Sequence, residues 1–199
     1  MKTYVIQKRR ASAEWSKIPS LSIDLQPWEP KVNIEACAQV YYDENALYVR
    51  LAAKEKDIRA EYFGPLDFPH RDSCLEFFLS PSEEDPRYLN FEFNPNCCLF
   101  LGIGTGRENL MRLAPDVQKL FSPCASRTSD SWNIQYRIPF SFICLFFPEF
   151  CPASGKKMRA NFYKCGDLTA QEHYLTWNEV VSEHPDFHRP ECFGELVFE

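Results

Sequence analysis

Two aromatic-rich segments of the sequence carry polar side chains at alternate positions. In the first, residues 88–94 (YLNFEFN), two phenylalanines alternate with the polar residues Asn90, Glu92 and Asn94. In the second, residues 72–79 (DSCLEFFL), Glu76 lies between apolar neighbours. Successive side chains of a β-strand point to opposite faces, so both segments predict a sheet with a phenylalanine-rich face and a face of carboxylates and amides.

Such a polar face is suited to binding a sugar. A carboxylate or an amide can engage two adjacent hydroxyl groups, and a flat aromatic ring can cover the apolar face of a pyranose. Asn161 and Tyr163 extend the predicted polar face onto a third segment. Trp177 is the candidate stacking ring, and Lys164 and His173 are predicted as second-tier contacts near it.

The same alternation has a plainer interpretation. An antiparallel sheet often buries one face and leaves the other in water, so Asn90, Glu92 and Asn94 could simply be solvated. Trp177 would then be a core residue. The alternation alone favours this plainer interpretation, and the case for a binding face rests on further features of the chain.

The elements that must position these residues are short strands. Strands are predicted at residues 36–42, 46–53, 73–79, 88–94, 97–102, 131–138, 158–165, 173–177 and 193–198. One short helix is predicted at residues 140–147, between Pro139 and Pro148. Short strands separated by proline- and aspartate-rich turns predict an all-β fold with little helix, an antiparallel β-sandwich of jelly-roll or immunoglobulin-like type. No repeat or linker divides residues 1–199, so we expect a single domain.

Composition limits the classes of partner and compartment. The chain has 199 residues and a formal net charge of −6, and a surface that binds phosphates needs a positive field, so we expect no nucleic-acid partner. No apolar run is long enough for a signal peptide or a membrane span. The nine cysteines are odd in number and irregularly spaced, which favours reduced thiols. We therefore expect a cytoplasmic protein with no membrane partner.

Taken in order, six pieces of the chain resemble carbohydrate-binding module family 9, and more closely the free-standing bacterial proteins that are similar to this family. The resemblance extends from about Trp15 to the C-terminus. The pieces are DSCLEFF at residues 72–78, YLNFEFN at 88–94, Trp132 with IPF at 138–140, ANF at 160–162, Trp177, and DFHRPECFGEL at 186–196.

The resemblance implies a non-catalytic β-sandwich that binds an oligosaccharide or polysaccharide. Characterised members are appended to xylanases and bind the ends of glucan and xylan chains between two tryptophans, with calcium at structural sites. Glycan-processing proteins are therefore implied as further partners, and structural calcium is the implied metal. Position by position, Trp177 matches the second sandwiching tryptophan, and Glu76 matches a carboxylate that hydrogen-bonds the sugar.

Three positions depart from the family pattern. His70 stands where the first tryptophan of the sandwich is expected, Glu92 where the family has an arginine, and Tyr163 where it has a glutamine. Half of the aromatic clamp and the cationic donor are thus replaced. His70 and Arg71 are then predicted to line the rim of the site.

The sequence also leaves an enzymatic function open. If their strands adjoin, Glu76 and Glu92 would form a carboxylate pair like that of a glycosidase, so a glycoside-processing enzyme subunit is one alternative. The chain carries no Gly-x-Ser-x-Gly, no His-Glu-x-x-His and no phosphate loop with its lysine.

Metal and haem sites are further alternatives. His184, His188 and Cys192 have a spacing that could hold zinc, although Pro185 and Pro190 prevent a single helical face. No calcium-binding loop of the EF-hand type is present. A related sandwich superfamily, the DOMON-type cytochrome domains, holds haem through an axial methionine and a histidine or lysine. The internal methionines of this chain are Met111 and Met158.

Overall fold

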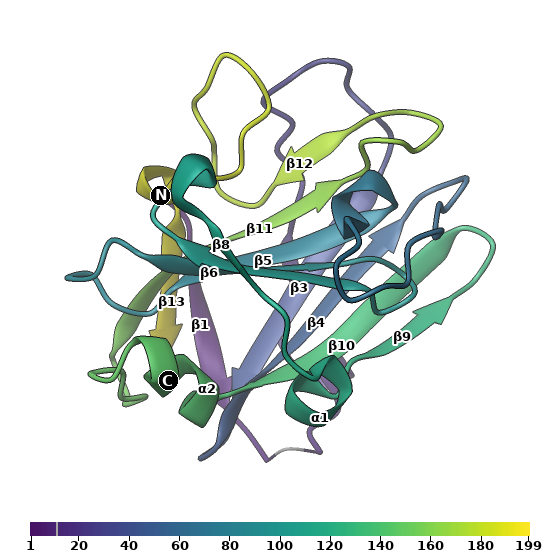
Figure 1. Cartoon of the computed structure of the whole chain (residues 1–199). Coiled ribbons are helices and arrows are strands. Elements are labelled where there is room, and N and C mark those ends of the chain that lie inside the picture. Colours follow the sequence, from purple (N-terminus) through teal and green to yellow (C-terminus); the bar gives the residue numbers. More distant parts are fainter. Residues whose placement is uncertain (11) are drawn as a thin grey trace.

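The structure is a computed structural model that describes residues 1–10 and 12–199. Its strands lie in two layers (Figure 1). The first layer contains β5 (Cys74–Ser80), β6 (Tyr88–Phe93), β7 (Leu99–Gly104), β8 (Met111–Leu113), β11 (Lys157–Cys165), β12 (Tyr174–Thr176) and β13 (Gly194–Phe198). The second layer contains β2 (Leu21–Ser22), β3 (Glu35–Tyr42), β4 (Ala46–Lys54), β9 (Cys124–Arg127) and β10 (Ser131–Pro139). One more strand, β1 (Thr3–Lys8), belongs to both layers.

Strand β1 makes the two layers one curled sheet. The strand order is β8-β7-β6-β5-β11-β13-β1-β3-β4-β10-β9, with β12 beside β11 and β2 beside β3. Residues Thr3 to Ile6 of β1 pair with β13, and Gln7 and Lys8 pair with β3. Both of these pairings are parallel, whereas the other strand pairings of the described residues are antiparallel. The predicted β-sandwich with little helix is confirmed, and the sheet is mixed rather than wholly antiparallel because β1 crosses between the layers.

The core lies between the facing layers and is rich in aromatic rings. Phe77 and Phe162 stack on neighbouring strands of the first layer with their ring centroids 4.7 Å apart. Phe93 contacts Tyr136 of the second layer, also at 4.7 Å. These contacts confirm that the phenylalanines predicted to share a face point inward, where burying apolar area stabilises the fold.

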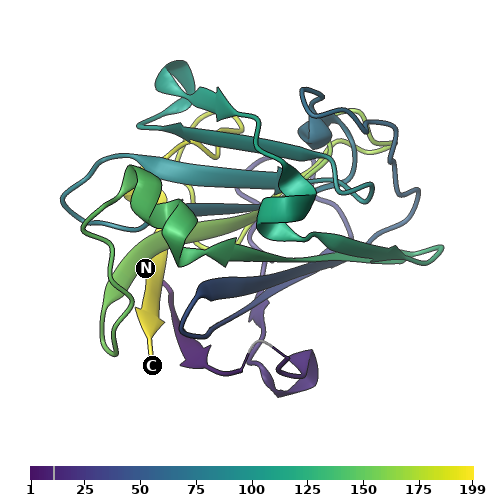
Figure 2. The ribbon, with the colours of Figure 1, turned by 60° about the horizontal axis from the view of Figure 1, so that its bottom comes forward.

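Short helices close one side of the sandwich (Figure 2). The α-helices are α1 (Val117–Phe121) and α2 (Phe140–Phe146), and α2 confirms the helix predicted after Pro139. Phe121 of α1 and Phe142 of α2 both pack edge-on against Phe91. The 3₁₀-helices are η1 (Trp15–Lys17), η2 (Pro69–Arg71), η3 (Arg107–Asn109) and η4 (Pro190–Cys192). None of the helices in the described ranges is long and apolar enough to cross a membrane.

The outer face of the first layer is covered as well. A second apolar cluster forms there from Phe78, Tyr88, Tyr163 and Phe193, and it is roofed by Trp28 and Phe187 from long loops. Every residue of β5 and β6 is consequently buried. The polar face predicted from the sequence is therefore not a solvated sheet surface: its side chains either bond to the covering loops or line a cavity beneath them.

Candidate functional site

A row of four side chains crosses the outer face of the first layer. The register pairs Phe100 with Glu92, Glu92 with Glu76, and Glu76 with Tyr163, on the adjacent strands β7, β6, β5 and β11. Side chains directly opposite on antiparallel strands have Cβ atoms about 5 Å apart. The sequence-based condition that the strands of Glu76 and Glu92 adjoin is thus met, and the two carboxylates face each other.

A pocket of about 370 Å³ opens above this row. The sheet supplies its floor through Glu76, Glu92, Phe100 and Cys165, and the walls come from loops, two 3₁₀-helices and the edge strand β12 through His70, Arg107, Asp167, Tyr174, Phe187 and His188. This volume is at the small end of the range for ligand sites in proteins. The pocket therefore has room for a small molecule or the end of a chain.

Glu92 is held from both sides. The imidazole Nδ1–H of His70 donates to Glu92 Oε2 over 3.0 Å, and the Asn90 amide donates to Glu92 Oε1 over 2.6 Å. Burial lowers the pKa of His70, but the hydrogen bond and the charge of Glu92 outweigh burial and raise this pKa above its ordinary value. The result is a positioned carboxylate with a histidine at the pocket wall.

Glu76 is in a different electrostatic environment. Its Oε1 accepts from the Cys165 thiol over 3.0 Å. Burial, and next the charge of Glu92, raise the pKa of Glu76 well above the ordinary value of a glutamic acid. The two neighbouring carboxyl groups thus differ in the hydrogen bonds that they can form. A carboxylate such as Glu92 only accepts hydrogen bonds, whereas a protonated Glu76 can also donate one.

Partly exposed rings and charges form the rim. Phe100 and Tyr174 are each partly accessible, and the Tyr174 hydroxyl donates to Asp167 over 3.2 Å. Arg107 is exposed and pairs with Asp186 over 3.1 Å. The pocket therefore combines apolar ring surface with hydrogen-bonding groups, the combination that a pyranose requires.

The structure brings together three of the sequence-predicted site residues, His70, Glu76 and Glu92, and a fourth, Tyr163, lies in the same row but beneath a roof. The Phe187 ring stacks on Tyr163 with centroids 4.1 Å apart, and the Tyr163 hydroxyl donates to the Phe187 carbonyl over 3.1 Å. Tyr163 thus supports the pocket wall and does not line the pocket.

The prediction that Trp177 is the stacking ring is wrong. Its side chain is 3% exposed and packs edge-on against Phe162 in the core. The register gives the reason: Thr176 pairs with Tyr163, so Trp177, one residue on, points to the inner face. The Trp177 ring also fills the space that a side chain at position 194 would need, since a Cβ added to Gly194 would lie 2.6 Å from the indole.

The predicted second-tier contacts also lie away from the pocket: Lys164 is on the inner face of β11, and His173 is hydrogen-bonded to it. Lys164 Nζ forms an ion pair with Glu55 over 3.2 Å and donates to His173 Nε2 over 2.6 Å. Lys164 follows Tyr163, so strand alternation turns it inward. Both residues are buried and hydrogen-bond to each other, and Lys164 also pairs with Glu55, which makes them structural.

The predicted amide contacts bind loops instead of lining the pocket. Asn94 donates to the Tyr62 carbonyl and to Asp72, and its Oδ1 accepts from the backbone of Asn96 and Cys98. Asn161 exchanges two hydrogen bonds with the backbone of Asn178. Both amides are fully buried, because each satisfies backbone groups of the loops that cover the sheet.

Arg71 is exposed and does not line the pocket. Its guanidinium lies 5.1 Å from the centre of the Phe68 ring, which is a cation–π contact. Of the two predicted rim residues, only His70 is therefore placed at the pocket.

Sequence reasoning missed the floor residue Phe100 and the wall residues Arg107, Asp167, Tyr174 and His188. Phe100 and Tyr174 carried a usable signal, since both lie in predicted strands, with Phe100 on the face opposite Leu99 and Leu101. The others come from loops whose position depends on contacts distant in the sequence. Alternation says nothing about such residues.

The zinc and haem alternatives do not find support in the geometry. His188 Nδ1 accepts from the Tyr88 hydroxyl over 2.7 Å, and His184, His188 and Cys192 do not form a ligand cluster within the described residues. Met158 is buried in the core and Met111 is exposed on β8, so neither lies in the pocket as a haem ligand.

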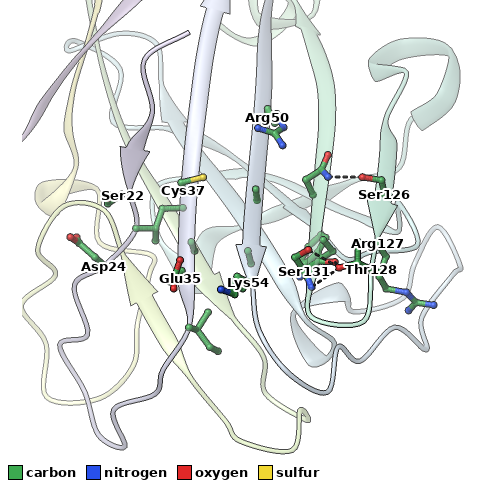
Figure 3. A pocket seen from close by; sticks show the side chains of 17 residues that line it. Ser22, Asp24, Glu35, Cys37, Arg50, Lys54, Ser126, Arg127, Thr128 and Ser131 are labelled. Atoms are coloured by element: carbon green, nitrogen blue, oxygen red, sulfur yellow. Dashed lines mark hydrogen bonds between the residues drawn. The ribbon is translucent and has the colours of Figure 1, made fainter. Parts of the chain in front are cut away.

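A larger cavity, of about 530 Å³, lies on the outer face of the second layer (Figure 3). Its labelled lining residues are mostly small, polar or charged, and they include Asp24, Glu35, Arg50 and Lys54. The one large ring in this lining, Trp132, is 2% exposed and donates to Glu55. The pocket of the first layer, which offers accessible rings beside carboxyl groups, is therefore the better candidate for a sugar site.

Comparisons with solved structures agree with this fold. A protein of Bacteroides uniformis described as carbohydrate-binding has a TM-score of 0.86 and 28% identity, over 100% of this chain and 99% of that one. A family 9 carbohydrate-binding module from Caldicellulosiruptor kristjanssonii is 14% identical in two structures. Its complex with glucose has a TM-score of 0.69 and covers 100% of this chain and 96% of that one. Its complex with cellotriose has a TM-score of 0.70 and covers 100% and 94%.

No curated protein matches the sequence. Residues 4–198, however, match the model of the family described as carbohydrate-binding family 9. The match spans both layers, from β1 to the last residue of β13. The chain belongs to carbohydrate-binding family 9.

Proposed function

We propose that the pocket above Glu76 and Glu92 binds the end of an oligosaccharide chain without cleaving it. The observation that carries this proposal is the row Phe100–Glu92–Glu76, which places an accessible ring and two facing carboxyl groups on the floor of one pocket. The bound glucose and cellotriose of the Caldicellulosiruptor module support a glucan ligand.

The hydrogen-bonding groups suit vicinal hydroxyls. Glu92 has each oxygen occupied by one donor, from His70 and Asn90, and each oxygen retains a further lone pair for a sugar hydroxyl. Glu76, with its raised pKa, can donate to a hydroxyl or ring oxygen as well as accept. Phe100 and Tyr174 offer apolar area to the sugar ring.

The enclosure favours a chain end. Walls from the loops around His70, Asp167 and His188 stand on several sides of the sheet floor. A long polysaccharide lying across a sheet would need an open groove, whereas a terminal sugar can enter a pocket. We therefore expect short cello-oligosaccharides to bind about as well as long ones.

Isothermal titration with glucose, cellotriose and xylotriose tests the proposal. E92Q should weaken binding of the best ligand by about tenfold or more, because a buried charged hydrogen bond contributes roughly 1.5–3 kcal/mol. E76L, which removes the hydrogen-bonding group of Glu76, should also weaken binding. E83Q, which removes an exposed carboxylate away from the pocket, is the matched control and should bind normally. Circular dichroism establishes that each variant is folded.

Two outcomes would overturn the proposal. The first is unchanged affinity in both folded pocket variants, which would place the sugar elsewhere, for example in the cavity of the second layer. The second is the release of new reducing ends from cellotriose by the unaltered protein but not by E76Q. That result would make the facing carboxyl groups a hydrolytic pair.

A further inference from the structure

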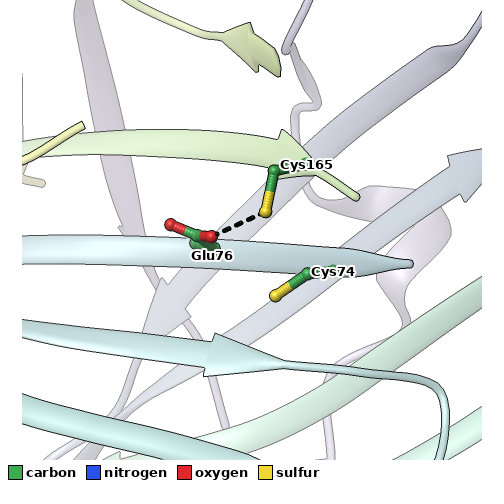
Figure 4. A group of neighbouring side chains, drawn as sticks. All are labelled: Cys74, Glu76 and Cys165. Atoms are coloured by element: carbon green, nitrogen blue, oxygen red, sulfur yellow. Dashed lines mark hydrogen bonds between the residues drawn. The ribbon is translucent and has the colours of Figure 1, made fainter. Parts of the chain in front are cut away.

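Two cysteines and a glutamate meet at the floor of the pocket. Cys74 of β5 and Cys165 of β11 are direct partners in the strand register, and Glu76 lies two residues along β5 on the same face. One ligand atom from each residue lies within 4.8 Å of those of the other two (Figure 4). All three side chains are buried, at 0%, 2% and 3% exposed respectively for Cys74, Cys165 and Glu76.

We infer that Cys74, Cys165 and Glu76 bind one thiophilic divalent cation, Zn²⁺, whose fourth coordination position faces the sugar pocket. Thiolate sulfur and carboxylate oxygen are ligands that Zn²⁺ accepts together, and three protein ligands with one open position is a common arrangement.

The spacing of the three residues suits a tetrahedral ion. Bonds of about 2.3 Å to sulfur and about 2.1 Å to oxygen place two ligand atoms of one tetrahedral ion roughly 3.5–3.8 Å apart. The Cys165 sulfur and Glu76 Oε1 are 3.0 Å apart, so they must separate slightly to admit the ion. Small side-chain rotations on two adjacent strands are sufficient for this change.

Charge provides an independent argument. Glu92 accepts hydrogen bonds from the His70 imidazole and the Asn90 amide, whereas the group that donates to Glu76 within the described residues is the thiol of Cys165. A buried carboxyl group beside a second carboxyl group is costly unless a cation compensates it. A divalent ion at this position supplies that compensation, and the protons of the two thiols and of the Glu76 carboxyl group pass to the solvent when the ion binds.

The pocket supplies the route of entry. Glu76 and Cys165 both line it, while Cys74 lies behind them. An ion can therefore enter from the pocket, and a water molecule or a sugar hydroxyl can fill its fourth position. The inference goes beyond the proposed sugar site, since the ion can bind when no sugar is present.

Cobalt titration tests the inference without using sugar binding as a readout. The full-length protein is stripped of metal with a chelator, kept reduced with a phosphine, and titrated with Co²⁺. We expect one equivalent to bind with a thiolate-to-cobalt charge-transfer band in the near ultraviolet and tetrahedral d–d bands in the visible, both abolished by one equivalent of Zn²⁺. Absence of the charge-transfer band in the unaltered protein would overturn the inference.

Matched cysteine variants assign the ligands. C74S/C165S should lose the charge-transfer band, whereas C124S/C151S, which removes two exposed thiols, should keep it. E76Q should retain both thiolates and hence the band, but require at least tenfold more Co²⁺ for half saturation. A band that persists in folded C74S/C165S would show that other cysteines bind the ion and would refute the site.

Discussion

At the scale of single residues, neighbouring positions on one strand have different functions because the two faces of the strand meet different surroundings. Tyr163 and Lys164 are adjacent, yet the first supports the pocket wall and the second pairs with Glu55 in the interior. The type of residue indicates what a side chain can do. The register of the strand decides whether that side chain points toward the pocket.

Trp177 provides the sharpest test of this point. As a core residue 3% exposed, it should cost about 3–5 kcal/mol of unfolding free energy when changed to alanine, because the change leaves a cavity beside Phe162. Urea unfolding followed by circular dichroism measures the loss. F63A, which removes a ring that is 71% exposed, should change stability little. A folded W177A variant of normal stability would contradict the core position of Trp177 and support the prediction that it is a stacking ring at the surface.

His188 should make the fold sensitive to acid. Burial, and next the charge of Arg107, lower the pKa of His188 to about 4 from an ordinary value of 6.5. Between these values the unfolded chain binds a proton that the folded chain does not, so stability falls as pH decreases from about 6.5 to 4, by at most about 3 kcal/mol. In H188Q, which keeps an acceptor for Tyr88, melting temperature should depend less on pH over this range. An equally steep dependence would contradict the assignment to His188.

At the scale of elements, alternation predicted the long strands β3, β4 and β10 but not the shortest strands, and the six-residue strand β1 was also missed. The predicted strands at 36–42, 46–53 and 131–138 match β3, β4 and β10 to within one residue. Strands β2 and β8 have two and three residues, too few to show a period. Such strands form because a partner offers its backbone hydrogen bonds, which is a tertiary effect that local sequence does not encode.

Some residues of the candidate site could likewise be predicted from the sequence, and others could not. Glu76 and Glu92 were predictable, because alternation placed them opposite apolar core residues on recognisable strands. Asp167 was not predictable, because the loop that carries it is positioned by contacts distant in the sequence, including a backbone bond from Asp167 to His70. Burial of the polar face by the 178–189 loop also could not be inferred from the pattern of the sheet.

Lys164 of β11 and Glu55, which follows β4, should matter for stability because each buried charge compensates the other. Replacing Lys164 with methionine leaves the Glu55 carboxylate buried without its cation, so K164M should lose about 3–5 kcal/mol of unfolding free energy. The double variant E55Q/K164M should recover much of this loss, since glutamine Oε1 can still accept from Trp132. Urea unfolding of both variants measures the difference. Equal losses in the two would show that Lys164 stabilises by packing rather than by charge.

At the scale of the whole molecule, the residues that stabilise the fold and the residues that form the pocket lie on opposite faces of the first layer. The core between the layers contains the interlocking rings of Phe77, Phe93 and Phe162, and the pocket lies on the opposite side of the same strands. Four separate segments of the chain, around His70, Arg107, Asp167 and His188, form the pocket walls. A wall residue can therefore be changed while the strand register that positions the floor is kept.

The position of β1 in the sheet determines when the sheet can close during synthesis. Thr3 of β1 hydrogen-bonds through its side chain to Glu195, 192 positions further along the chain. During synthesis from the N-terminus, β1 is made first, but its neighbour β13 emerges only after the other strands. The seam between the two layers is thus the last part of the sheet that can close, and until then β1 has one free edge.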